Sequence, residues 1–126
     1  MNIPHISSID AWKKLQQDIA KTCQDYHHPV ENIQLIAVSK TVAANNIVPL
    51  LQAGQSLFAE NRVQEAAEKW PSLRQKFNTI ELHLIGPLQS NKTAEAVTIF
   101  DVIQTVDREK IAKNLAKEMH KQKKHL

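Results

Sequence analysis

The chain has 126 residues, and its composition is that of one modest globular domain. Apolar residues make up 42% and charged residues 23% of it, which excludes disorder along the whole chain. The net charge of +3 is concentrated near the end: from residue 107 onward there are seven basic and three acidic residues, whereas residues 1–106 hold nine and ten. Because the basic surplus is confined to one helix and its tail, we expect no nucleic-acid partner.

Cysteine content and hydropathy limit the cellular setting. Cys23 is the only cysteine, which excludes an intrachain disulfide and a zinc site built from cysteines. No apolar run approaches the ~20 residues that a membrane-spanning helix needs, and the polar N-terminus differs from a signal peptide. We therefore expect a cytoplasmic protein with no membrane partner.

The first predicted element is a helix. Ser7 and Asp10 form an N-cap pair, and an apolar residue recurs at every third or fourth position from Trp12 to Tyr26. The segment 27–29, His-His-Pro, ends the helix, because a residue before proline is disfavoured in the helical region.

A strand and a short helix follow. Residues 33–38 form an apolar run rich in branched side chains, which is typical of a buried strand. The helix runs through 47–51 and ends at Gly54, a favoured residue just past a helix end. If Asn46 is the N-cap, Pro49 lies at the third helical position, where its missing N–H breaks no intrahelical bond.

Strand and helix then alternate three more times. The expected strands are 57–59, 80–85 and 102–106. The first two expected helices are 63–70, which Pro71 ends, and 91–99, which follows the Gly86-Pro87 turn. Asp107 caps a last helix, whose apolar stripe is Ile111, Leu115 and Met119. The strands begin near residues 33, 57, 80 and 101, and this regular spacing predicts an α/β fold of parallel units. Two architectures remain open: a small doubly wound sheet, and part of a (β/α)8 barrel, of which four units are about half.

In both architectures the site is expected where the strands end. Lys40, in Ser39-Lys40-Thr41, directly follows an apolar run, so we expect it to be partly desolvated; desolvation lowers the pKa of an amine and suits Schiff-base chemistry with an aldehyde. The alternative is a lysine that extends into water. The second strand is followed by Glu60-Asn61-Arg62, which either orient a ligand or cap the next helix.

The third strand carries a further set of polar residues. His83 alternates with Leu82 and Leu84, as a hydrogen-bonded core histidine would. Beyond the Gly-Pro turn, Gln89, Asn91 and Lys92 form a polar segment that a turn does not need. A lysine (Lys40), an amide (Asn61) and this polar segment follow successive strands, and together they predict a pocket.

Three runs of sequence carry a resemblance to a known family: AVSKT at 37–41, FAENRVQE at 58–65 and HLIGPLQSNK at 83–92. In this order and at these separations they resemble the YggS/PROSC-like family of pyridoxal phosphate homeostasis proteins, and the match extends from about residue 8 to the last helix. The resemblance implies the N-terminal half of a TIM-type (β/α)8 barrel like the N-terminal domain of alanine racemase. Residues 1–29 would be its N-terminal helix and 30–126 four β/α units.

The resemblance also implies pyridoxal 5′-phosphate as the cofactor. By this resemblance Lys40 forms the internal aldimine, Asn61 and His83 line the cofactor, and Asn91 and Lys92 belong to a polar loop near it; no metal is implied. The family is implicated in vitamin B6 and amino-acid homeostasis, and its members look like cofactor carriers or regulators rather than established enzymes.

The chain departs from the family pattern in three ways. Ala59 stands where the family usually has glycine, and Arg62 where an aromatic residue is common. Family members are nearly twice as long, and the missing half carries their phosphate-binding loop; Gly54 and Gly86 are the only glycines here, so no Gly-rich cradle is expected. Four strands of a barrel leave two edges and an apolar face uncovered, so we expect self-association or aggregation.

Two other functions remain open. The first is a racemase-like enzyme with Lys40 as a base, which needs a second base on the opposite face of the cofactor; Tyr26, the only tyrosine, is badly placed for that role. The second is a small β/α protein without a cofactor. The lysines at 113, 117, 121 and 124 recur at helical spacing and predict a solvated face.

Overall fold

Four strands form one parallel sheet in the order β1-β2-β3-β4, in a computed structural model that describes residues 7–126. The strands are β1 (Ala37–Val38), β2 (Leu57–Glu60), β3 (Glu81–Leu84) and β4 (Val102–Ile103). Strands that are consecutive in the chain are neighbours in the sheet, whereas a doubly wound sheet reverses its order at a switch point. The topology therefore decides between the two predicted architectures in favour of the partial barrel.

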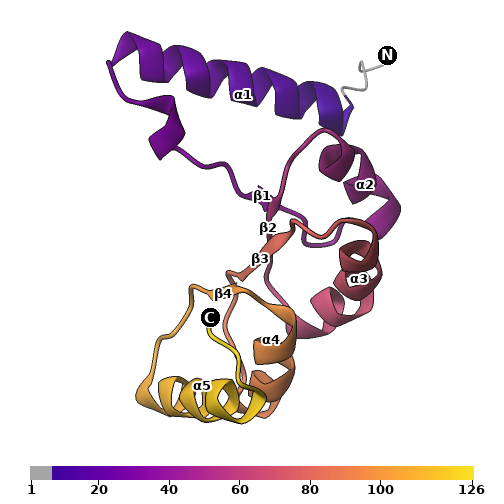
Figure 1. Cartoon of the computed structure of the whole chain (residues 1–126), viewed down its shortest axis with the longest axis vertical. Coiled ribbons are helices and arrows are strands. Elements are labelled where there is room, and N and C mark those ends of the chain that lie inside the picture. Colours follow the sequence, from indigo (N-terminus) through magenta and orange to yellow (C-terminus); the bar gives the residue numbers. More distant parts are fainter. Residues whose placement is uncertain (1–6) are drawn as a thin grey trace, which may run out of the picture.

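One side of this sheet is covered by helices (Figure 1). After α1 (Ser8–Asp25) and the short η1 (Val30–Asn32), the chain forms α2 (Ala44–Gln52), α3 (Val63–Lys76), η2 (Ser90–Lys92), α4 (Thr93–Ile99) and α5 (Glu109–Gln122). Helices α2, α3 and α4 lie side by side along the strands, and α5 packs on α4. In the described part of the chain, no helix is long and apolar enough to cross a membrane.

The core lies between the sheet and these helices. Its largest fully buried apolar side chains are Trp70, Phe58, Phe100, Ile47, Leu82, Leu84, Leu88, Ile111 and Val97. The ring of Phe58 on β2 packs 5.0 Å from the ring of Trp70 on α3. Burial of these side chains is the main stabilising contribution to the fold.

The strand register defines a second face, which we call the inner face. Phe58 and Leu82 belong to the core under the helices, so Ala59 and His83 point to the opposite side, because side chains alternate along a strand. Val38 and Val102 pair with these two residues and share their face. The inner face thus consists of four aligned residues, and Val38 on it is 50% exposed.

The ends of two predicted elements are confirmed. The Ser7 hydroxyl accepts a hydrogen bond from the Asp10 N–H at 3.1 Å, and α1 stops at Asp25, just before His-His-Pro. Gly54 follows the end of α2 with φ +106°, a conformation that favours glycine.

Other boundaries differ from the prediction. The N-cap of α2 is Ala43 rather than Asn46, so Pro49 lies inside the helix, where it cannot donate to the Asn45 carbonyl. The N-cap of α5 is Arg108 rather than Asp107. Helix α3 continues past Pro71 to Lys76; burial of Leu73 beyond the proline holds this last part on the sheet.

Strand pairing shortens the predicted strands. Of the run 33–38 only Ala37 and Val38 pair with β2. The Leu35 carbonyl instead accepts a hydrogen bond from the Gln55 side chain at 2.7 Å. Strand β4 is likewise two residues long rather than five. Each of β1 and β4 has one neighbour in the sheet, so both are edge strands.

Candidate functional site

Lys40 lies in the turn that connects β1 to α2. Ser39 extends the pairing of β1, because its N–H donates to the Ala59 carbonyl at 3.0 Å, and Lys40 is the next residue. Lys40 is exposed, so the expected desolvation of its amine is wrong. The physical reason is that Lys40 lies beyond the last paired residue of β1, at the edge of the sheet. Among residues 7–126, Lys40 makes no ion pair.

The structure brings Lys40, Asn61 and His83 to the inner-face side of the sheet. Lys40 and Asn61 come two residues after Val38 and Ala59, which are paired on that face. His83 lies on the same face one step deeper, on β3, and is 9% exposed. The three residues lie on, or just past the ends of, three consecutive strands, and those strands are parallel neighbours in the sheet.

His83 presents a polar ring atom on this face. The Gln104 amide nitrogen lies 2.9 Å from His83 Nδ1. In the tautomer that carries its hydrogen on Nε2, the amide of Gln104 donates to Nδ1. Nε2 lies 3.4 Å from Glu81 Oε2 but is buried without a hydrogen-bond partner among residues 7–126. Sequence reasoning missed Gln104, because its contact joins residues 21 positions apart.

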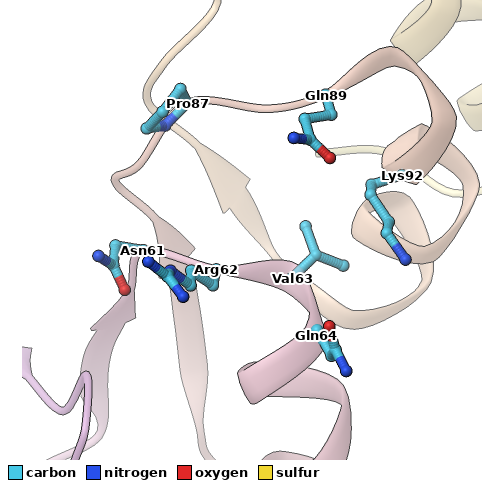
Figure 2. A pocket seen from close by; sticks show the side chains of 7 residues that line it. All are labelled: Asn61, Arg62, Val63, Gln64, Pro87, Gln89 and Lys92. Atoms are coloured by element: carbon cyan, nitrogen blue, oxygen red, sulfur yellow. The ribbon is translucent and has the colours of Figure 1, made fainter.

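A cleft of ≈ 580 Å³ lies between the start of α3 and the loop after β3 (Figure 2). Its lining consists of Asn61, Arg62, Val63, Gln64, Pro87, Gln89 and Lys92. Figure 2 shows Asn61 and Lys92 at opposite ends of this cleft. Of the predicted site residues, Lys40, His83 and the exposed Asn91 are not among those that line it.

A glycine holds the loop after β3 against β2. A Cβ placed on Gly86 would lie 2.2 Å from the Asn61 backbone oxygen, so only glycine fits this close approach. The Thr105 hydroxyl donates to the Gly86 carbonyl from the next strand connection. Gly86 therefore sets the position of the Asn61 backbone beside the cleft.

A buried charged cluster lies on the opposite side of the sheet from His83. Glu60, which ends β2, is 0% exposed and pairs with Lys69 on α3, with 3.0 Å between Oε2 and Nζ. Glu60 and Asn61 were predicted to orient a ligand or cap the next helix, yet α3 has Arg62 as its N-cap and no side-chain cap. The signal for Glu60 was a carboxylate at the end of an apolar strand; nothing in the sequence distinguished Lys69 from the exposed lysines.

The two residues that depart from the family pattern are both accommodated. Ala59 is fully buried in β2 and pairs with Val38 and His83 in ordinary strand geometry. Arg62 is exposed and lines the cleft. Among residues 7–126, no group of three His, Cys, Asp or Glu side chains is placed to hold a metal ion.

The chain is similar in sequence to curated pyridoxal phosphate homeostasis proteins. The protein of Pasteurella multocida (strain Pm70) is 44% identical over 113 residues, which are 90% of this chain and 48% of that protein. The protein of Haemophilus influenzae (strain ATCC 51907 / DSM 11121 / KW20 / Rd) is 42% identical over 115 residues, or 91% and 46% of the two chains. The chain thus spans about half the length of these relatives. No family model matches it.

Solved structures show the same partial fold. PipY of Synechococcus elongatus PCC7942 with PLP bound superimposes with a TM-score of 0.71 and 36% identity, over 86% of this chain and 50% of PipY. The structure of PipY without PLP gives a TM-score of 0.72 and 37% identity, over 84% and 49%. The parallel sheet and its helices therefore correspond to about half of a known fold, as the sequential strand order indicates.

Proposed function

Because this chain belongs, over about half the length of its relatives, to the family of pyridoxal phosphate homeostasis proteins, we propose that it binds pyridoxal 5′-phosphate and acts in vitamin B6 and amino-acid homeostasis. The observation that carries this proposal is the exposed Lys40 at the end of β1, on the same side of the sheet as Asn61 and His83. PipY, which shares the fold, has been solved with PLP bound.

The residues of this chain fit the aldehyde and ring of the cofactor. When bound, the cofactor supplies an electrophilic aldehyde attached to an electron-withdrawing ring. Lys40 is exposed, and its primary amine would hold the cofactor through that aldehyde. His83 Nε2, which has no hydrogen-bond partner among residues 7–126, adds a polar ring atom on the inner face, and Asn61 adds an amide.

Fewer of the described residues are suited to bind the phosphate group of the cofactor. The described residues contain no glycine-rich loop, since Gly54 ends a helix and Gly86 packs on Asn61. Lys92 lines the cleft at the end opposite Asn61, and among the predicted site residues it is the cation that we assign to the anionic end of the cofactor. We accordingly expect weaker binding than in a protein with a dedicated phosphate loop.

The racemase-like alternative gains no support. Tyr26, the only tyrosine, is 79% exposed at the end of α1, which contacts α2 and η1 rather than the sheet. We therefore propose a carrier or regulator, with a small-molecule cofactor as its partner. Cys23, free and buried, fits the reducing cytoplasm in which we place the protein.

An absorbance titration with pyridoxal phosphate tests this proposal. Wild type and Lys117→Ala, which removes an exposed lysine on α5, should show the same saturable Schiff-base band, and Lys40→Ala should lose it. Borohydride reduction followed by peptide mapping should place the label on Lys40. Labelling spread over the surface lysines, or a band that persists in Lys40→Ala, would overturn the assignment.

A further inference from the structure

The buried cluster around Lys69 has no part in the function proposed above. Lys69 is 8% exposed, and its ammonium lies 3.0 Å from Glu60 and 3.3 Å from Glu65. Glu60 also accepts from the Trp70 indole N–H at 3.1 Å and from the Ser39 hydroxyl. A buried ion pair is costly to desolvate, so its presence calls for an explanation other than stability.

The cluster holds the turn that carries Lys40. The Lys69 ammonium donates to the Ser39 carbonyl at 2.7 Å and to the Val42 carbonyl at 2.9 Å. Since the Val42 N–H donates to the Ser39 carbonyl at 3.1 Å, residues 39–42 form a β-turn with Lys40 at its second position. One buried cation thus binds both ends of the turn.

The middle of this turn has a strained backbone. Thr41, its third residue, has φ +63°, a left-handed conformation that β-branched residues rarely adopt. The Thr41 N–H donates to Glu65 Oε1 at 2.5 Å, and Glu65 in turn contacts Lys69. A strained residue keeps such a conformation only where its surroundings hold it, so the contacts of Lys69 and Glu65 fix this turn.

We propose that Lys69, with Glu60 and Glu65, is a positioning residue for Lys40. The cluster lies on the helix-covered side of the sheet, opposite the inner face, and acts through the backbone of the turn. By holding the turn it fixes the point from which the Lys40 side chain extends over the inner-face side, and this preorganisation raises the affinity for an aldehyde ligand. The inference rests on the proposed role of Lys40, but its effect on the turn is measurable without cofactor.

Two variants separate positioning from mere folding. Lys69→Met combined with Glu60→Gln removes the ion pair without leaving a buried charge unpaired. Glu65→Ala leaves that pair intact and removes the acceptor of the Thr41 N–H, in case the double variant fails to fold. The matched controls are Lys76→Met and Glu68→Ala, two exposed positions on the same helix.

Amide hydrogen exchange of the cofactor-free protein is the first readout. In the double variant, the N–H groups of Thr41 and Val42 should exchange at least tenfold faster than in wild type. In Glu65→Ala, the N–H of Thr41 should exchange at least tenfold faster. Exchange of the β3 amides should be unchanged in both variants, and the two control variants should exchange like wild type. Lys69→Arg, which keeps the charge and the donors, should restore the protection. Unchanged exchange at Thr41 and Val42 in either folded variant overturns the proposal.

The affinity for pyridoxal phosphate is the second readout. We expect at least a tenfold loss in both variants, with the residual label still on Lys40; affinity within twofold of wild type would show that the turn does not position the amine. If the wild-type protein itself fails to label at Lys40, the proposed function is wrong. The exchange data then still decide whether Lys69 holds the turn.

Discussion

Replacing Gly86 with alanine is expected to push the loop after β3 away from β2. Gly86 is buried, and the added Cβ would lie 2.2 Å from the Asn61 backbone oxygen, whereas ordinary contacts begin at 3.4 Å. The loop must therefore shift by about 1.2 Å, because the opposing atom is backbone and has no rotamer to change. The neighbouring hydrogen bond from the Ile85 N–H to the Glu60 carbonyl, now 2.9 Å, lies directly beside this contact.

The expected cost follows from these two effects. Overpacking of this kind costs ~1–3 kcal/mol, and loss of the Ile85 hydrogen bond adds ~1 kcal/mol. The free energy of unfolding should thus fall by roughly 2–4 kcal/mol, which for a chain of this size lowers Tm by roughly 8–16 °C. Because the loop after β3 moves away from Asn61, pyridoxal phosphate labelling of Lys40 should weaken in the same variant.

Urea and thermal denaturation, with Gly54→Ala as the control, measure this effect. Gly54 has φ +106° and nothing within 4 Å of an added Cβ, so its substitution strains the backbone only and should cost ~1 kcal/mol without altering the labelling. If Gly86→Ala melts within about 2 °C of wild type, the close approach of loop and strand does not exist as described.

Three further predictions concern other parts of the molecule. Trp70→Phe keeps a ring beside Phe58 but removes the N–H that Glu60 accepts, so the unfolding free energy should fall by ~1–3 kcal/mol; an unchanged urea midpoint would contradict this. Burial lowers the pKa of the Lys124 amine below 10.5, so just below that pH the unfolded chain binds more protons than the folded one. The excess stability of wild type over Lys124→Met should therefore grow as the pH rises towards 10.5 and stay constant near neutrality; a constant difference throughout would refute the shift. Finally, the edge strands and the half-exposed Val38 predict self-association, and light scattering that finds only monomer at the highest attainable concentration would count against it.

Lys124 also corrects the expectation of a solvated lysine face on the last helix. The Lys124 ammonium donates to the carbonyls of Thr98 and Phe100 at 3.0 and 2.9 Å, and so covers the end of α4. The cause is the left-handed residue Lys123, which ends α5 and turns the chain back toward α4. The prediction extended the helical spacing past Lys123, and it therefore placed Lys124 on the solvated face of α5, where the structure does not have it.

The local elements and the family were both predictable from the amino-acid sequence. Alternating apolar runs and capping residues predicted the strand and helix units, and the three motifs around Lys40, Asn61 and His83 predicted the family that the relatives confirm. Both signals are local: each depends on side-chain periodicity or residue identity within about a dozen positions. The roles of those three residues in cofactor binding stay predictions.

The strand order and the identity of the buried lysine, in contrast, depend on tertiary contacts. Periodicity is the same in a doubly wound sheet and in a barrel, and the sequential pairing of β1 to β4 depends on contacts between distant segments. For the same reason desolvation was expected at Lys40 and is found at Lys69, since α3 packs back on the end of β2 and places Lys69 beside Glu60. Burial is a property of what lies opposite a residue in space, and its neighbours in the chain do not specify it.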